Sequence, residues 1–269
     1  MDLHDAVAAY VRDGQTVALE GFTHLIPFAA GHEVIRQSRR DLTLVRMTPD
    51  LIYDQMIGMG CASTVVFSFA GNPGVGSLRR LRDAVEHDWP HPIRLVEHSH
   101  AAMAAAWDAG AAGLPFAMLR HGYAGSGLRE VDPDIRSVTC PFTGEALTAV
   151  PALRPDVGIV HAQRADRRGN VLVEDIIGVQ KEVVLASTVS IVTVEEVVDD
   201  LAPPSLNSCV IPGWAIDAVC VAPEGVRPSY THGYYARDNA FYTAWDTIAA
   251  DRDGFLVWMD EHVLRAVHA

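Results

Sequence analysis

The stretch TVALEGFTHLIPF, residues 16–28, decides the fold of this chain. Its first residues, 16–19, form an apolar, β-branched run that is typical of a buried strand. The run stops at Glu20 and Gly21, and we expect Gly21 to let the backbone turn there. From Pro27 a helical pattern of apolar residues begins. A buried strand, a turn that carries a carboxylate and a helix form the unit from which parallel α/β sheets are built.

The same alternation continues along the rest of the chain. Helical spacing is found at residues 3–11, 27–39, 77–89 and 99–112. Strands are predicted at 42–47, 63–69, 93–97, 156–162, 170–174, 189–194 and 215–223. Residues 126–155 combine Gly, Pro and Asp with short apolar runs, which indicates a hairpin or an irregular excursion. The order predicts an α/β fold with an open, mostly parallel sheet, flanking helices and right-handed crossovers.

We interpret residues 1–269 as one domain with an elaborated C-terminal tail, because no linker or repeat divides the chain. The tail starts near Tyr230 and holds most of the remaining aromatic residues. Such residues are expected to pack against the domain or to form a subunit interface.

Composition and charge limit the classes of function. Apolar residues make up 49% and charged residues 20%, as in soluble globular proteins. The longest apolar stretch, residues 183–194, is shorter than the ~20 residues of a membrane span, and we expect no signal peptide, because no basic region followed by an apolar run is found at the start of the sequence. Four cysteines without C-x-x-C spacing are predicted to be buried free thiols. A net charge of −13 argues against nucleic acid. We therefore expect a cytoplasmic protein that binds neither a membrane nor nucleic acid.

The glycine-rich turn AGNPGVGS, residues 70–77, is a candidate ligand-binding loop. Its glycines let the backbone approach a ligand closely, and Ser77 is expected to cap the next helix. The candidate ligand contacts are Asn72, Gly74, Val75 and Gly76. The alternative is an ordinary tight connection between a strand and a helix.

A second candidate turn is EHSH, residues 97–100. Glu97 is a candidate for acid–base or hydrogen-bonding chemistry, and His98 and Ser99 are candidate substrate contacts. The alternative is a solvated charge at the start of the following helix. His98 and His100 lack a third ligand, so we predict no metal site.

A third candidate turn is HAQRADRRGN, residues 161–170. His161 and Gln163 lie just past a buried run and could face a cleft, although a hydrogen-bonded structural histidine is the alternative. The segment from Ala165 onward indicates a turn, with a positive φ at Gly169.

In their order along the chain, these motifs resemble the alpha subunit of the family I CoA-transferases, and the glutaconate CoA-transferase alpha branch most of all. The segments that carry the resemblance are DGQTVALEGF (13–22), GAAGLPF (110–116), GSGL (125–128), VPALRPDVGIVHAQRADRRGN (150–170), TVEEVV (193–198), IPGWAIDAVCVAP (211–223) and GYYARDN (233–239).

The resemblance implies an enzyme that moves CoA between an acyl-CoA and a carboxylic acid. It implies a beta subunit that carries the nucleophilic glutamate, in a heterodimer that is often doubled. Coenzyme A would enter as a thioester substrate, and no permanently bound cofactor is expected. This chain would supply one wall of the cleft and contact the acyl substrate. The expected substrate contacts are Phe22, Thr23, Asn72, Gly74, Val75, Gly76, Glu97, His98, Ser99, Arg120 and Gln163.

The first motif departs from the family pattern, which reads Gly-Gly-Phe, three residues, then Gly-x-Pro. Glu20 and Ile26 stand where the family has glycine, and the proline is displaced to Pro27. These departures keep open a diverged acyl-CoA hydrolase or lyase, with Glu97 or Glu20 as general base. A non-catalytic ligand-binding module is the remaining alternative, supported by fold analogy alone.

The acyl group stays unidentified from the sequence. A second carboxylate on the substrate would need a cation, and the candidates are Arg46, Arg79 and Arg120.

Overall fold

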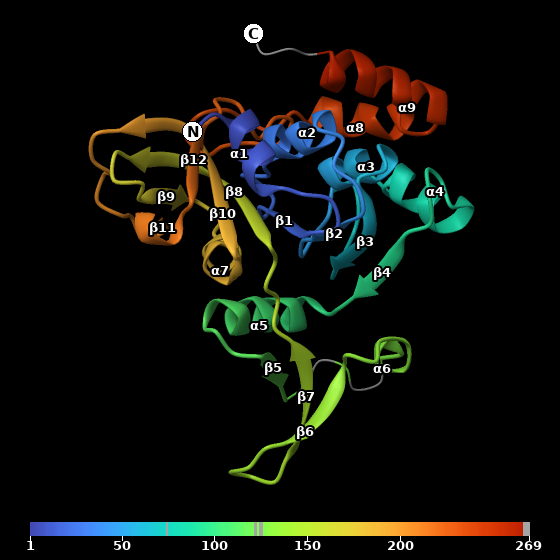
Figure 1. The fold of residues 1–269 in the computed structure, drawn as a ribbon, viewed down its shortest axis with the longest axis vertical. Helices are drawn as coiled ribbons and strands as arrows, with labels where there is room; N and C mark the ends of the chain where they lie inside the picture. Colours follow the sequence, from blue (N-terminus) through green and yellow to red (C-terminus); the bar gives the residue numbers. More distant parts are fainter. Residues whose placement is uncertain (74, 121–122, 124–125, 266–269) are drawn as a thin grey trace.

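A computed structural model describes residues 1–73, 75–120, 123 and 126–265. Seven parallel strands form the body of the main sheet (Figure 1). In spatial order they are β12 (Ala218–Val221), β10 (Val189–Val198), β8 (Val157–Asp166), β1 (Thr16–Glu20), β2 (Leu42–Val45), β3 (Ala62–Phe67) and β4 (Arg94–Glu97). The two strands β9 (Val171–Glu174) and β11 (Ser208–Ile211) extend the sheet in antiparallel pairing beyond the end of β8.

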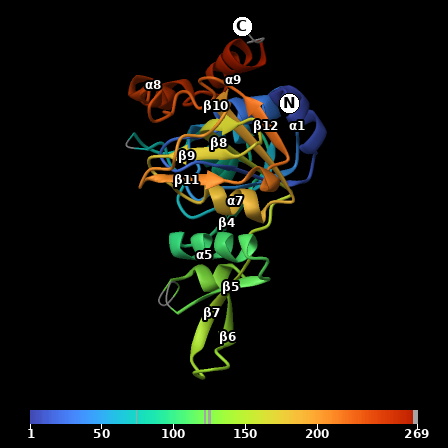
Figure 2. The ribbon, with the colours of Figure 1, turned by 90° about the vertical axis from the view of Figure 1, so that its left-hand side faces the viewer.

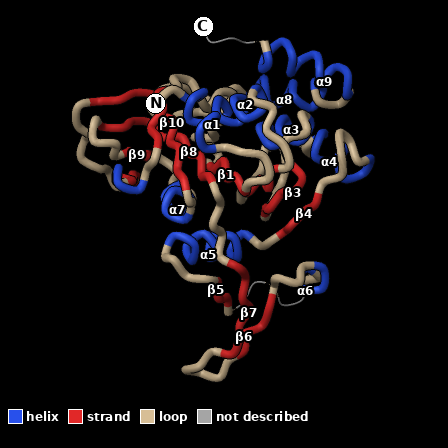
Figure 3. Tube along the Cα trace, viewed as in Figure 1, coloured by secondary structure: helices blue, strands red, loops and turns tan. Residues whose placement is uncertain are grey.

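Helices cover both faces of the main sheet, and each face has its own apolar core (Figures 1 and 3). One face is covered by α1 (Leu3–Tyr10), α2 (Phe28–Arg36), α3 (Leu51–Gly58), α4 (Arg79–His87), α8 (Asn239–Ile248) and α9 (Arg252–Met259). The other is covered by α5 (His100–Ala111) and α7 (Gln180–Ala186). Two single turns, η1 (Gly213–Ala215) and η2 (Asp260–Leu264), follow β11 and α9.

A smaller sheet projects from the main body beyond α5 (Figures 1 and 2). It is antiparallel, in the order β5 (Phe116–Leu119), β7 (Ala146–Pro151) and β6 (Arg136–Thr139). The short helix α6 (Leu128–Val131) precedes β6. The excursion that the sequence predicted at residues 126–155 is therefore a β6–β7 hairpin whose third strand comes from β5.

The predicted fold class is confirmed, with four local corrections. The strand at residues 170–174 is antiparallel, not parallel. The sequence missed α3, because all eight of its residues are buried, Asp54 and Gln55 included, and a helix buried on every side shows no amphipathic period. It also missed β11 and α7, so the apolar stretch at 183–194 is a helix end followed by a strand. Finally, the N-cap position of α4 is occupied by Leu78, and no side chain caps the helix there. The predicted cap by Ser77 is therefore wrong.

The four cysteines are free thiols, as predicted. Cys61 and Cys220 are buried, whereas Cys140 and Cys209 are half-buried, so the predicted burial is wrong for these last two. Within the described ranges, every helix is too short or too polar to cross a bilayer.

Candidate active site

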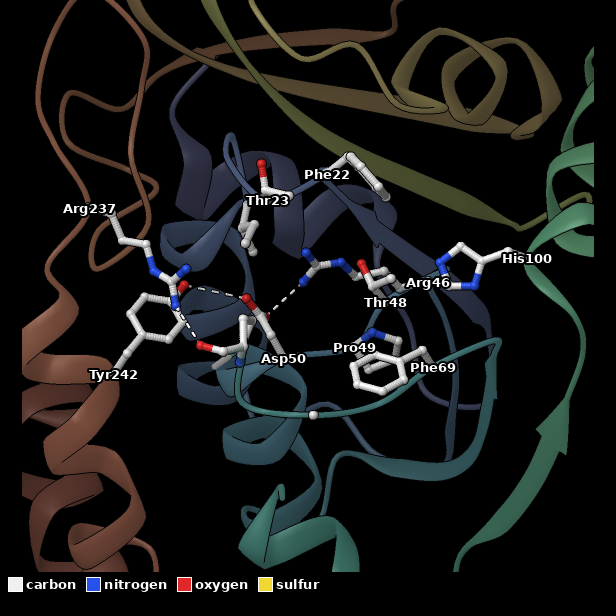
Figure 4. Close-up of a pocket in the computed structure, with 13 residues that line it drawn as sticks. Phe22, Thr23, Arg46, Thr48, Pro49, Asp50, Phe69, His100, Arg237 and Tyr242 are labelled. Atoms are coloured by element: carbon white, nitrogen blue, oxygen red, sulfur yellow. Dashed lines mark hydrogen bonds and ion pairs between the residues drawn. The ribbon is translucent and has the colours of Figure 1, made fainter. Parts of the chain in front are cut away.

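A cavity of about 210 Å³ opens where the strands β1, β2 and β3 end (Figure 4). In parallel α/β sheets, ligands bind at this carboxyl edge. The connections after these strands and the start of α5 supply one part of its lining: Phe22, Thr23, Ile26, Arg46, Thr48, Pro49, Asp50, Phe69, Gly71, Pro73 and His100. Arg237 and Tyr242, from the C-terminal tail and α8, supply the rest.

The turn after β1 is held by close backbone packing at Gly21. A Cβ at this position would lie 2.5 Å from the carbonyl oxygen of Leu25, so only glycine fits. Gly21 itself is not among the glycines with positive φ; Thr23 (63°) and Leu25 (53°) take that conformation instead. A β-branched residue rarely does so. Gly21 thus acts by lacking a side chain, and the turn brings Phe22 and Thr23 to the cavity wall, as predicted.

Arg46 is the buried centre of the cavity floor. Its Nη1 donates to Asp50 Oδ1 at 2.8 Å, and its Nη2 donates to the carbonyl oxygen of Gly21 at 2.8 Å. Its Nε lies 3.8 Å from Glu20 Oε1. One guanidinium therefore ties together the turn after β1 and the start of α3.

Glu20 is buried beside Arg46 and is not among the residues that line the cavity. Its carboxylate accepts hydrogen bonds from the backbone N–H groups of Gly21 (3.2 Å) and Met47 (3.1 Å). Burial raises the pKa of Glu20 to about 7, against the lowering effect of Arg46 and of the two N–H donors. The side chain thus joins the ends of β1 and β2.

The tail residues Arg237 and Tyr242 form a wall that the sequence did not predict. The Tyr242 hydroxyl contacts Asp50 Oδ2 at 3.4 Å, and its carbonyl oxygen accepts from Asn72 Nδ2 at 2.7 Å. The guanidinium carbon of Arg237 lies 3.8 Å from the centre of the Tyr242 ring. Asn72 is therefore placed behind the wall, as a support. The tail does pack, as predicted, and it also shapes the cavity.

His161 and Gln163 lie elsewhere and have their own partners. His161 is fully buried, with Nδ1 2.8 Å from Thr193 Oγ1 and Nε2 3.1 Å from Glu195 Oε1. The side-chain amide of Gln163 bonds the backbone of Glu174 in both directions, at 3.1 and 3.0 Å. The expectation that Gln163 contacts substrate is not supported, because this pairing joins β8 to β9.

Glu195 is the centre of a second buried polar cluster. Besides His161, it accepts hydrogen bonds from Thr231 Oγ1 (2.8 Å), the Tyr235 hydroxyl and the backbone N–H of Glu224 (2.7 Å). These donors lower the pKa of Glu195 to about 2, against the opposing effect of burial. The cluster fastens the tail segment that leads to Arg237 onto β10.

The turn 97–100 contributes only His100 to the cavity. Glu97 is exposed and is not among the lining residues. His98 Nδ1 lies 3.1 Å from the Tyr123 hydroxyl, and burial lowers its pKa. Ser99 caps α5 by accepting from Ala102 N–H. These two residues are therefore engaged in the packing of α5.

Few other predicted contacts reach the cavity. Val75 and Gly76 are exposed beside it and are not among its lining residues. Gly74 lies outside the described residues. Arg120 follows β5 in the smaller sheet and pairs with Glu145 at 3.1 Å. Its predicted contact with substrate has no support in this arrangement.

Comparisons with known proteins confirm the α/β fold and show the family of the chain. The sequence model of the coenzyme A transferase family ("Coenzyme A transferase") matches residues 1–222. The chain is 62% identical over 263 residues to the alpha chain of 3-oxoadipate CoA-transferase from Pseudomonas knackmussii, covering 98% of this chain and 93% of the relative. It is 33% identical over 284 residues to the alpha chain of glutaconate CoA-transferase from Acidaminococcus fermentans, covering 98% and 87%.

Solved structures give the same result. The crystal structure of glutaconate coenzyme A-transferase from Acidaminococcus fermentans superposes with a TM-score of 0.89 at 32% identity, covering 98% of this chain and 88% of the other. A variant of the decarboxylase AibA/AibB gives a TM-score of 0.80 at 28% identity, covering 96% and 97%. The match in sequence and the match in fold thus extend over almost the whole chain, and we conclude that it belongs to the coenzyme A transferase family, among the alpha subunits of family I.

Proposed function

We propose that this chain is the alpha subunit of a heteromeric enzyme that transfers CoA between an acyl-CoA and a dicarboxylic acid of the 3-oxoadipate type. The observation that carries the proposal is the 62% identity to the alpha chain of a 3-oxoadipate CoA-transferase, which extends over nearly the full length of both chains. A beta subunit completes the enzyme.

The lining of the cavity supports a role for a second subunit. Asp50 is the one carboxylate among the described lining residues, and it is engaged by Arg46 and Tyr242. A carboxylate held in this way is a poor nucleophile, because attack would leave Arg46 buried without its ionic partner. This supports the proposal that the nucleophile comes from the other chain, as the family resemblance implies.

The proposed chemistry proceeds on the glutamate of the beta subunit. Its carboxylate attacks the thioester carbonyl and displaces CoA as a thiolate, which gives an acyl-glutamyl anhydride. The thiolate then attacks the glutamyl carbonyl, releases the first acid and leaves a glutamyl-CoA thioester. The second acid reverses these two steps: its carboxylate attacks the glutamyl carbonyl and displaces the CoA thiolate, which gives a new anhydride. The thiolate then attacks the acyl carbonyl of that anhydride, which forms the new acyl-CoA and releases the glutamate carboxylate. This chain holds the acyl group against the cavity wall.

The hydrolase or lyase hypothesis gains nothing from the arrangement of its candidate bases. Glu97 is exposed outside the cavity, and Glu20 is buried with its oxygens facing Arg46 and two backbone N–H groups. Neither group is placed to take a proton from a water in the cavity. The ligand-binding module likewise has no observation in its favour.

The test is CoA exchange by the purified complex of this chain with its beta subunit. With succinyl-CoA and 3-oxoadipate, we expect 3-oxoadipyl-CoA and succinate, and no free CoA. Borohydride added with acyl-CoA alone should inactivate the complex and label the beta subunit. This chain without its partner is the control. Exchange by this chain alone, or release of free CoA in the absence of any acceptor acid, would overturn the proposal.

A further inference from the structure

We propose that Arg237 binds the second carboxylate of a dicarboxylic substrate and thereby sets the preference of the enzyme for dicarboxylic over monocarboxylic acids. The inference rests on the proposed function, because only a substrate with a carboxylate remote from the thioester needs such a group. Arg237 lies in the C-terminal tail, outside the residues 1–222 that the family sequence model matches.

The three arginines that the sequence suggested for this role are already paired with acids. Arg46 is buried with Asp50 at 2.8 Å. Arg79 makes two bonds to Asp246, at 2.8 and 3.0 Å. The third, Arg120, pairs with Glu145 in the smaller sheet. A substrate carboxylate would have to displace an existing carboxylate from each of them.

Arg237 differs in lining the cavity without an acidic partner. In the part of the chain that the structure describes, no carboxylate lies within 4.0 Å of its guanidinium nitrogens. Its Nη2 donates to the Pro73 carbonyl oxygen at 3.2 Å, and its Nε is buried with no hydrogen-bond partner among those residues. The neighbouring Asp238 points away, because it accepts from Phe241 N–H as the cap of α8. A guanidinium in this state has donors left for a carboxylate.

The position of Arg237 is fixed by what lies beneath it. The guanidinium stacks on Tyr242, which is buried and held between Asp50 and Asn72. Figure 4 shows Arg237 and Tyr242 together on one side of the cavity and His100 on the opposite side. An anchor fixed in advance loses little entropy on binding, so it discriminates between ligands at little energetic cost.

The size of the cavity fits an acyl chain and not a complete acyl-CoA. Its volume of about 210 Å³ is below the roughly 300–1,000 Å³ of sites that enclose a drug-sized ligand. Arg46 and Asp50 neutralise each other within the floor. Arg237 therefore adds to the cavity lining a positive charge that no carboxylate among the described lining residues pairs with, which suits the free carboxylate end of a short dicarboxylic chain.

The experiment compares Arg237→Met with wild type in the complex with the beta subunit, using adipate and hexanoate as matched acceptors and as ligands in isothermal titration calorimetry. Loss of a charge-assisted hydrogen bond predicts a drop of about 10- to 100-fold in kcat/KM for adipate and a similar rise in its Kd. The kcat/KM and the Kd for hexanoate should stay within about 2-fold of the wild-type values. Arg237→Lys keeps the charge without the planar fork. Its kcat/KM and Kd for adipate should therefore lie between those of Arg237→Met and wild type.

Arg227→Met is the matched control. Arg227 belongs to the same tail, stacks on Tyr235 at 4.5 Å and pairs with Glu224, but it does not line the cavity. Arg227→Met should leave kcat/KM and Kd unchanged for both adipate and hexanoate. An equal loss for both acids in Arg237→Met, or an unchanged Kd for adipate, would overturn the proposal. Arg237→Lys decides the question in the same way if the Met variant fails to assemble.

Calorimetry separates this inference from the proposed function. If the wild-type complex transfers no CoA and yet binds adipate in a manner that depends on Arg237, the transferase proposal fails and the assignment of Arg237 holds. If CoA transfer proceeds, and Arg237→Met has the wild-type kcat/KM and Kd for both acids, the assignment of Arg237 fails and the transferase proposal holds.

Discussion

Arg46 and Asp50 form a buried ion pair of 2.8 Å at the floor of the cavity. The two residues lie four positions apart, one just after β2 and the other just before α3. Asp50 also meets Tyr242 from the tail, so the pair connects the sheet edge with a segment distant in the sequence. Disruption of this pair should lower the stability of the protein and change the shape of the cavity.

Asp50→Ala should destabilise the protein strongly. It leaves the buried guanidinium of Arg46 with the Gly21 carbonyl oxygen and a carboxylate of Glu20 at 3.8 Å, and breaking a buried pair in this way costs about 3–5 kcal/mol. Urea unfolding of the complex, followed by circular dichroism, measures the change. Asp246→Ala is the control, because the Arg79–Asp246 pair is part-exposed and should contribute about 1 kcal/mol or less. Equal effects of the two substitutions would contradict the structural role of Asp50.

Gly21→Ala should distort the turn that carries Phe22 and Thr23. The new Cβ would meet backbone oxygens of Leu25 and His24 at 2.5 and 2.7 Å, and backbone cannot move aside as a flexible side chain can. Overpacking of this kind costs about 1–3 kcal/mol, and we expect a larger relative loss of CoA transfer than of stability. Gly127→Ala, whose Cβ would have no atom of the described residues within 4 Å, should be neutral in both assays. Normal activity in Gly21→Ala would show that the turn tolerates movement.

Glu20 should make the protein less stable as the pH rises. Its pKa is about 7 in the folded chain and 4.5 for the unperturbed group, so between these values the folded state holds more protons than the unfolded state. The free energy of unfolding therefore falls from pH 4.5 to 7, on the order of 3 kcal/mol from this group. Glu20→Gln should flatten that slope in urea titrations across this range. The slope is the informative quantity, because Gln also loses one acceptor for the two backbone N–H groups. A slope identical to wild type would refute the assignment.

Glu195 should have the opposite effect, at lower pH. Its pKa is lowered from 4.5 to about 2, so it stabilises the folded state above pH 4.5, and this contribution is lost as the pH falls toward 2. Glu195→Gln should cost about 2–3 kcal/mol at neutral pH and reduce the acid sensitivity of unfolding. Glu196→Gln is the control at the next position, where the side chain is exposed and pairs with Arg164 and Tyr234. It should change stability by at most about 1 kcal/mol. A variant at Glu195 that matches the Glu196 control would disprove the role of the buried cluster.

Much of the fold followed from hydrophobic period alone. The strands β1, β2, β3, β8, β10 and β12, and the helices that alternate with them, carry buried apolar residues that recur at the spacing of the element. β4 was predicted as well, although its residues are mostly exposed. That signal disappears where burial surrounds an element, as in α3, and it does not give the direction of pairing, as in β9, which was predicted as a strand but pairs antiparallel with β8. Neither property is written in the local pattern.

For the candidate site as well, one part was predictable from the sequence and another part was not. The sequence by itself determined that a turn after β1 would bring Phe22 and Thr23 to the carboxyl edge of the sheet, because Gly21 ends a buried strand there. Only the tertiary structure decided which charges are free, because pairing depends on distance in space. In the fold, Arg46 pairs with Asp50, and Glu20 is buried beside them. Arg237, which is distant in the sequence, stacks on Tyr242 at the same cavity. A cation is available to a ligand only where the fold leaves it without an acid.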